Sequence, residues 1–173
     1  MKPLFSRRPA SSSIVLFGFA VALVVFAADQ ATKLWILNGI DLDARAPGDS
    51  IVIIDPIFKL TMVWNRGVSF GLFPAESWWQ RGLLIAVSLI ISGVLAVWMF
   101  SAVRRLQALA FGMIIGGAIG NVLDRFFYGA VADFLDFSGM YFPYVFNIAD
   151  ASISVGVGML LLDLVLHGEQ DKR

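Results

Sequence analysis

The sequence predicts an all-α membrane protein, a bundle of four transmembrane helices with a small extracytoplasmic β-rich loop between helices 1 and 2. The 173 residues are 58% hydrophobic and only 15% charged, whereas soluble domains carry about 25% charged residues. Mean hydropathy is +0.79. The apolar residues fall in long blocks, a pattern typical of membrane spans. Because so few spans pack into one bundle, we expect a single integral membrane domain over residues 1–173.

Four apolar blocks are long enough to cross about 30 Å of hydrocarbon at about 1.5 Å per residue. They cover residues 14–37, 82–103, 106–123 and 144–166. The first block could instead be a cleaved signal peptide, since it follows basic residues and Val25-Phe26-Ala27 resembles a cleavage site. Its apolar character continues to Leu37, however, which is long for such a peptide and favours a retained span.

Lysine and arginine indicate the orientation of the four spans. One side of the arrangement collects Lys2, Arg7, Arg8, Arg104, Arg105, Lys172 and Arg173. That side is expected to be cytoplasmic, with both termini inside, because short cytoplasmic flanks are rich in these residues. In the outward loop, residues 38–80, segments 51–54 and 58–64 predict short strands of a sheet on the membrane surface. Trp78 and Trp79 suit an interfacial belt.

Composition excludes several kinds of chemistry. The formal net charge is zero, so nothing favours binding to nucleic acid. There is no cysteine and only one histidine, His167, which argues against disulfides, thiolate catalysis and zinc sites built on Cys and His. No metal and no cofactor is expected. Carboxylates, lysine and tyrosine remain as acids and bases.

Aspartates gather near the outer membrane face. Helical rise and span direction bring four of them to similar depth, each from a separate element: Asp29, Asp124, Asp133 and Asp150. Carboxylates at membrane depth are costly and mark function or pairing. Two have a structural interpretation, because Asp29 can pair with Lys33 one helical turn away and Asp124 adjoins Arg125.

Two further aspartates have interpretations unrelated to catalysis. Asp163 lies near the inner boundary and is expected to be an interfacial or packing residue. Asp136 falls in a predicted loop and is expected to be solvated.

Asp133 and Asp150 have no cation beside them in the sequence. Two carboxylates held close together cannot both ionise easily, so one keeps a proton while the other stays charged. Such a pair can activate water and protonate a leaving group. The residues alone leave three functions open: peptide hydrolysis, ion-coupled transport and a non-enzymatic scaffold. Transporters usually bind near the midplane and often show repeats, and neither feature is visible here.

Glycines in the third span also allow two interpretations. They stand at positions 112, 116, 117 and 120 and leave one face of the helix slim. That face could serve close helix packing, or it could leave room for a substrate helix or acyl chain.

Five short motifs follow one another along nearly the whole chain. They are Asp29-Gln30-Ala31-Thr32-Lys33, Asn65-Arg66-Gly67-Val68-Ser69-Phe70-Gly71, Gly116 to Arg125, Val131-Ala132-Asp133-Phe134, and Phe146-Asn147-Ile148-Ala149-Asp150-Ala151-Ser152. With these motifs on a four-span frame, the sequence resembles the lipoprotein signal peptidase family, also called signal peptidase II. Ser69 stands where the family often has Ala, and Ala132 where it often has Val.

The resemblance implies an aspartyl endopeptidase of the bacterial inner membrane, with its active site at the extracytoplasmic face. Its substrates would be prolipoproteins carrying diacylglycerol on the lipobox cysteine, cut just before that cysteine. The family is also the target of the cyclic peptide globomycin. The implied catalytic pair is Asp133 and Asp150. The implied supporting residues are Asp29, Lys33, Asn65, Gly67, Asn121, Asp124, Arg125 and Asn147. A monomer surrounded by membrane lipid is expected, because no coiled coil or partner surface is apparent.

Overall fold

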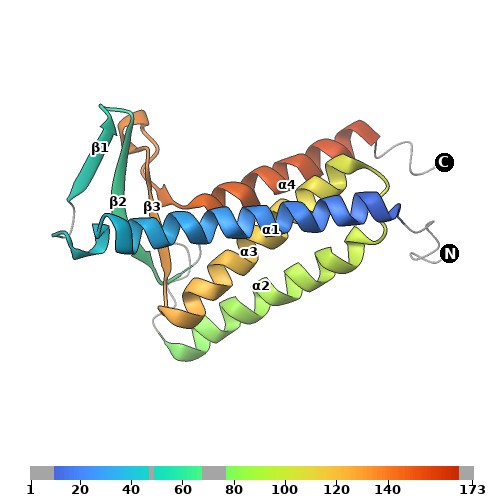
Figure 1. The fold of residues 1–173 in the computed structure, drawn as a ribbon, viewed down its shortest axis with the longest axis horizontal. Coiled ribbons are helices and arrows are strands. Elements are labelled where there is room, and N and C mark those ends of the chain that lie inside the picture. Colours follow the sequence, from blue (N-terminus) through green and yellow to red (C-terminus); the bar gives the residue numbers. More distant parts are fainter. Residues whose placement is uncertain (1–9, 47–48, 68–76, 168–173) are drawn as a thin grey trace.

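The computed structural model describes residues 10–46, 49–67 and 77–167. Within these ranges four helices are long and apolar enough to cross a membrane. They are α1 (Ser12–Leu34, continued as a π-helix over Trp35–Gly39), α2 (Trp78–Met99), α3 (Arg105–Phe127) and α4 (Ile148–His167). The start of α1 and the end of α4 lie at the end of the bundle remote from the strands (Figure 1).

The bounds of α2 differ from those of the apolar block that predicted it. The helix begins at Trp78, ahead of residue 82, because Ser77 caps it. The backbone N–H of Ser77 and its hydroxyl both donate to Gln80 Oε1, at 3.0 and 2.7 Å. The helix ends at Met99, and the apolar residues up to 103 form the turn into α3.

A four-stranded antiparallel sheet stands across the other end of the bundle (Figure 1). Its order is β1 (Ser50–Ile54), β2 (Phe58–Asn65), β3 (Val131–Asp136) and β4 (Val145–Phe146). The two predicted strands are present as β1 and β2 between α1 and α2, but the sheet extends beyond that loop, because β3 and β4 follow α3. The motif around Asp133 is a central strand, with Val63 of β2 opposite Asp133.

Asp136 closes β3, and the prediction that it is solvated is wrong. Its residue is only 4% exposed. The Thr61 hydroxyl donates to its Oδ2 at 2.7 Å, and Lys59 Nζ lies 3.5 Å from the same oxygen. Burial opposes its ionisation, but hydrogen bonds from Thr61 and Ser138 together with the Lys59 charge hold the pKa of Asp136 below its usual range.

The sheet is fixed to the end of α1 by a small apolar cluster. Ile36 and Leu42, which follow α1, pack with Leu60 of β2 and Phe134 of β3. All four side chains are buried. The cluster therefore holds the central strands of the sheet against the bundle.

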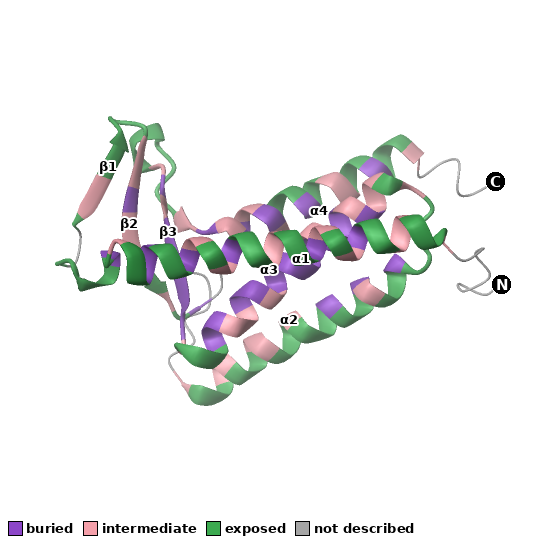
Figure 2. Ribbon diagram, in the orientation of Figure 1, coloured by how far each residue is buried: buried purple, intermediate pink, exposed green. Residues whose placement is uncertain are grey.

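Helix α3 lies at the centre of the bundle, where it contacts each of the other three helices. It is the most thoroughly buried helix (Figure 2). Its glycines allow the other helices to approach. A methyl group added at Gly112 would overlap the Gly18 carbonyl of α1, and one at Gly117 would overlap the Ala149 carbonyl of α4. Of the two interpretations of this glycine face, the structure shows close helix packing at both positions.

Asp163 lies at the end of the bundle remote from the sheet, where it links α4 to the start of α3. Arg104 donates to its two carboxylate oxygens at 2.8 and 3.0 Å, and Gln107 donates to it at 2.7 Å. His167 Nδ1 lies 3.3 Å away. Asp163 is thus a buried ion-pair partner far from the other aspartates of the bundle.

Candidate active site

Asp133 and Asp150 meet where the sheet joins the helices. Asp133 lies in the middle of β3 and Asp150 is the third residue of α4. Their exposed fractions are 1% and 5%. Two carboxylates, one from a strand and one from a helix, are thus buried at one junction.

Asn147 connects the two aspartates directly. Its Nδ2 donates to Asp133 Oδ1 at 2.7 Å, while its Oδ1 accepts the backbone N–H of Asp150 at 2.9 Å. The second bond is a helix N-cap, in which a side-chain oxygen satisfies an amide that the first turn leaves without a helical partner. One fully buried side chain therefore fixes the start of α4 and one catalytic candidate together.

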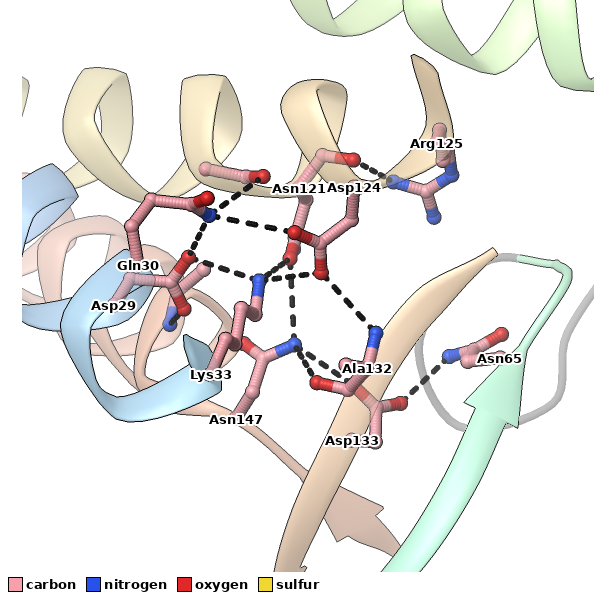
Figure 3. A network of polar contacts seen from close by, with 12 residues as sticks. Asp29, Gln30, Lys33, Asn65, Asn121, Asp124, Arg125, Ala132, Asp133 and Asn147 are labelled. Atoms are coloured by element: carbon pink, nitrogen blue, oxygen red, sulfur yellow. Dashed lines mark hydrogen bonds and ion pairs between the residues drawn. The ribbon is translucent and has the colours of Figure 1, made fainter. Parts of the chain in front are cut away.

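Two other asparagines complete a set of amide donors around the pair, and Figure 3 shows the contacts of Asn65 and Asn147 with Asp133. Asn121 of α3 donates to Asp150 Oδ1 at 2.9 Å. Asn65 at the end of β2 donates to Asp133 Oδ2 at 3.0 Å, and its own Oδ1 accepts the Gly67 N–H at 3.0 Å. Both carboxylates thus receive hydrogen bonds that hold them in fixed rotamers.

The environment of Asp133 favours its protonated form. Burial, and next the negative charge of Asp150, raise the pKa of Asp133 to about 7, against hydrogen bonds from Asn65 and Asn147 that favour the charged form. Near neutral pH the pair can therefore hold one proton and one negative charge. That is the state required for combined acid and base chemistry.

A buried ion cluster lies beside the pair, at the junction of α1 and α3 (Figure 3). Lys33 Nζ is 2.8 Å from Asp29 Oδ2 and 2.8 Å from Asp124 Oδ2. It also donates to Asn121 Oδ1 at 3.2 Å. The predicted pairing of Asp29 with Lys33 is present. Asp124, expected to be braced by its neighbour Arg125, has Lys33 of another helix as a cation.

The two carboxylates of this cluster also bind the backbone next to each catalytic candidate. Asp29 Oδ1 accepts the N–H of Ala149, the residue before Asp150, at 3.0 Å. Asp124 Oδ2 accepts the N–H of Ala132, the residue before Asp133, at 3.1 Å. Lys33 pairs with both of these carboxylates. A single ammonium therefore links the two side chains that hold the backbone before Asp133 and before Asp150.

Arg125 joins α3 to the segment that follows β2. Its guanidinium donates to the Gly67 carbonyl at 2.7 Å and to the Asn121 carbonyl at 3.3 Å. Arg125 thus binds two backbone carbonyls. Gly67 is the last residue described before the gap at 68–76, so the rest of that motif, including Ser69, lies outside the described residues.

Sequence reasoning missed one member of the network, Gln30. Its Nε2 donates to Asp29 Oδ2 at 3.0 Å and to Asp124 Oδ1 at 3.3 Å. Its position next to Asp29 in the first motif was the available signal. The site residues predicted from the sequence all lie on the described part of the chain and belong to one continuous polar network. Among those described residues, no three His, Asp or Glu side chains are grouped so that they could hold a metal ion.

Comparison with known proteins places this arrangement in a family. Residues 21–166 match the model of the family described as Signal peptidase (SPase) II. A lipoprotein signal peptidase of Caulobacter vibrioides is 53% identical over 152 residues, 87% of this chain and 88% of the relative. One of a Methylobacterium species is 45% identical over 152 residues, 87% of this chain and 90% of the relative.

Two solved structures share the fold, and both are described as a bacterial membrane enzyme. One has a TM-score of 0.78 at 24% identity and covers 95% of this chain and 94% of its own. The other has a TM-score of 0.71 at 26% identity and covers 91% of this chain and 96% of its own. The family match spans most of the chain, as do the curated relatives, so this protein belongs to the signal peptidase II family of bacterial membrane proteases.

Proposed function

We propose that this protease removes signal peptides from bacterial prolipoproteins by water attack at an Asp133–Asp150 dyad, cutting just before the lipidated cysteine. Membership of the signal peptidase II family supports the activity and the substrate class. The observation that supports the dyad is the Asn147 side chain, which bonds Asp133 and the backbone of Asp150 at once. The diacylglyceryl modification of the substrate belongs to the same proposal.

In the proposed reaction the pair holds one proton near neutral pH, in line with the raised pKa of Asp133. The ionised carboxylate of the pair takes a proton from water, and the water oxygen attacks the scissile carbonyl carbon. The protonated carboxyl group then gives its proton to the leaving nitrogen as the C–N bond breaks. The products are a signal peptide with a new carboxylate and a lipidated cysteine with a free amine.

The supporting residues keep this pair in place. Asn65, Asn121 and Asn147 hold the carboxylate oxygens, while Asp29 and Asp124 hold the adjoining backbone. Lys33 neutralises the two braces. Arg125 and Gly67 fix the outer loop near the site.

We further propose that the chain is one integral domain of the bacterial inner membrane, with α1 to α4 as spans and both termini cytoplasmic. The lysine and arginine distribution supports this orientation. The dyad then lies at the extracytoplasmic end, where a lipid-anchored substrate presents its scissile bond at nearly constant depth. A monomer remains the expectation.

The test is cleavage of a diacylglyceryl prolipoprotein, followed by gel mobility. Asp133→Asn and Asp150→Asn should each abolish cleavage while the protein still inserts into membranes. Asp136→Asn is the matched control, because Asp136 lies on the same strand and is buried, yet it pairs with Lys59. Cleavage near the native rate by either dyad variant would refute the assignment.

A further inference from the structure

Large apolar side chains stand uncovered between β3 and α4. Met140 is 58% exposed, Tyr141 99%, Phe142 39% and Tyr144 42%. The thirteen residues from 137 to 149 include no charged side chain. Contiguous exposed apolar patches mark surfaces that bind a membrane or another protein. These exposed side chains do not belong to any of the four helices. They lie in the connection between β3 and α4, at the sheet end of the molecule (Figure 2).

We call residues 137–146 the aromatic loop, and its base is well packed. Phe137 stacks on Phe58 of β2 with ring centroids 4.8 Å apart, and on Phe146 of β4 at 5.7 Å. Phe142 meets Phe146 edge to face at 5.9 Å. These contacts hold the loop in one shape while the Tyr141 ring points outward.

The position of the aromatic loop follows from its connection to α4. Tyr144 precedes the first residue of α4, Ile148, by four residues, and four extended residues span at most about 14 Å. The loop lies beside the start of α4, at the end of the bundle covered by the sheet (Figure 1). Exposed tryptophans mark the same end, with Trp35 following α1 at 54% and Trp78 starting α2 at 79%.

We propose that the aromatic loop inserts into the headgroup layer of the membrane that the four helices cross. It would anchor the sheet, and with it Asp133, at a fixed height over the bilayer. This inference rests on the proposal that α1 to α4 are membrane spans. Three observations favour lipid over a protein partner: the loop carries no charge, it leads directly into α4, and exposed tryptophans lie at the same end of the bundle. Tyrosine suits this layer because its ring is apolar and its hydroxyl is polar.

Site-directed spin labelling tests the anchor, and the absence of native cysteine allows single-label variants. Tyr141→Cys and, separately, Met140→Cys are labelled with a nitroxide in the full chain, in phosphatidylethanolamine–phosphatidylglycerol vesicles. Collision with oxygen, which enters lipid, is compared with collision with a water-soluble nickel chelate. Ile90→Cys on the exposed face of α2 is the lipid control and Ala44→Cys is the water control; both positions are exposed in the structure.

The loop labels should favour oxygen over the nickel chelate relative to the Ala44 label, at a depth shallower than the Ile90 label. Nickel access equal to that of the Ala44 label at both loop positions would overturn the anchor. Spin–spin broadening that disappears on dilution with unlabelled protein would also overturn it, since it would show that a second copy covers the loop. If the Ile90 label itself met the nickel chelate, the proposal that fails would be the membrane span.

Discussion

Replacement of Lys33 by methionine should destabilise the protein far more than loss of an ordinary lysine. The substitution keeps an unbranched apolar stem but removes the ammonium that lies 2.8 Å from each of two carboxylates. The side chains of Lys33, Asp29 and Asp124 are 3%, 0% and 1% exposed. Water cannot replace the lost cation without opening the helix interface.

The expected loss is about 3–5 kcal/mol, the usual effect of removing one partner from a buried ion pair. The Lys59–Asp136 pair provides the scale for comparison. There the distance is 3.5 Å and the lysine side chain is 36% exposed, so Lys59→Met should cost no more than about 1 kcal/mol.

Both variants can be measured by SDS titration in mixed micelles, with helical circular dichroism reporting unfolding. The double variant Lys33→Met/Asp124→Asn should recover part of the loss, because it removes one of the uncompensated charges while an amide oxygen can still accept the Ala132 N–H. Equal losses for Lys33→Met and Lys59→Met would show that the buried cluster does not carry the stability assigned to it.

Three further predictions concern pH, packing and metal. Activity should fall as pH rises through about 7, because the raised pKa of Asp133 marks where the dyad loses its proton. With substrate below saturation, the midpoint of this fall should lie at about pH 7. A cleavage rate that is flat from pH 6 to 8 would contradict this. Gly116→Ala places a methyl group against the Ala22 carbonyl of α1 and should cost about 1–3 kcal/mol, whereas Gly82→Ala meets nothing within 4 Å and should be neutral or stabilising by up to about 1 kcal/mol; thermal denaturation compares the two. Incubation with EDTA should leave cleavage unchanged, since the proposed mechanism routes no step through a metal, and an inhibition reversed by added Mg²⁺ or Zn²⁺ would count against it.

The helices and the local ion pair were accessible from the sequence. Long uncharged blocks are sufficient to predict four helices, and the spacing of Asp29 and Lys33 is sufficient to place them on one helical face. The motifs selected most of the polar residues that form the network. Even so, the sequence indicated only that these residues matter, and their contacts came from the structure.

Pairings between distant segments were not accessible. Lys33 reaches Asn121, 88 residues away, and Gln30 reaches Asp124, 94 residues away. No local sequence pattern distinguishes the ion pair of Asp124 with Lys33 from one with its neighbour Arg125. Likewise, the segment that forms β3 was predicted to be a connection and not a strand. Its polar and apolar residues do not alternate, because nearly the whole strand is buried. This central position in the sheet is also why Asp136 is buried and not solvated.

The spacing of Asp29 and Lys33 has a consequence for how the chain is made. In the proposed topology α1 enters the membrane before α3 is made, because a chain emerges from its N-terminus first. A lone buried charge is costly at that stage, but α1 carries an anion and a cation one turn apart and can enter as a neutral unit. When Asp124 later arrives on α3, it joins an ion pair that is already in the bilayer. Lys33 thus neutralises Asp29 while α1 is inserted during biosynthesis. In the folded protein the same lysine also pairs with Asp124 and so holds α1 against α3.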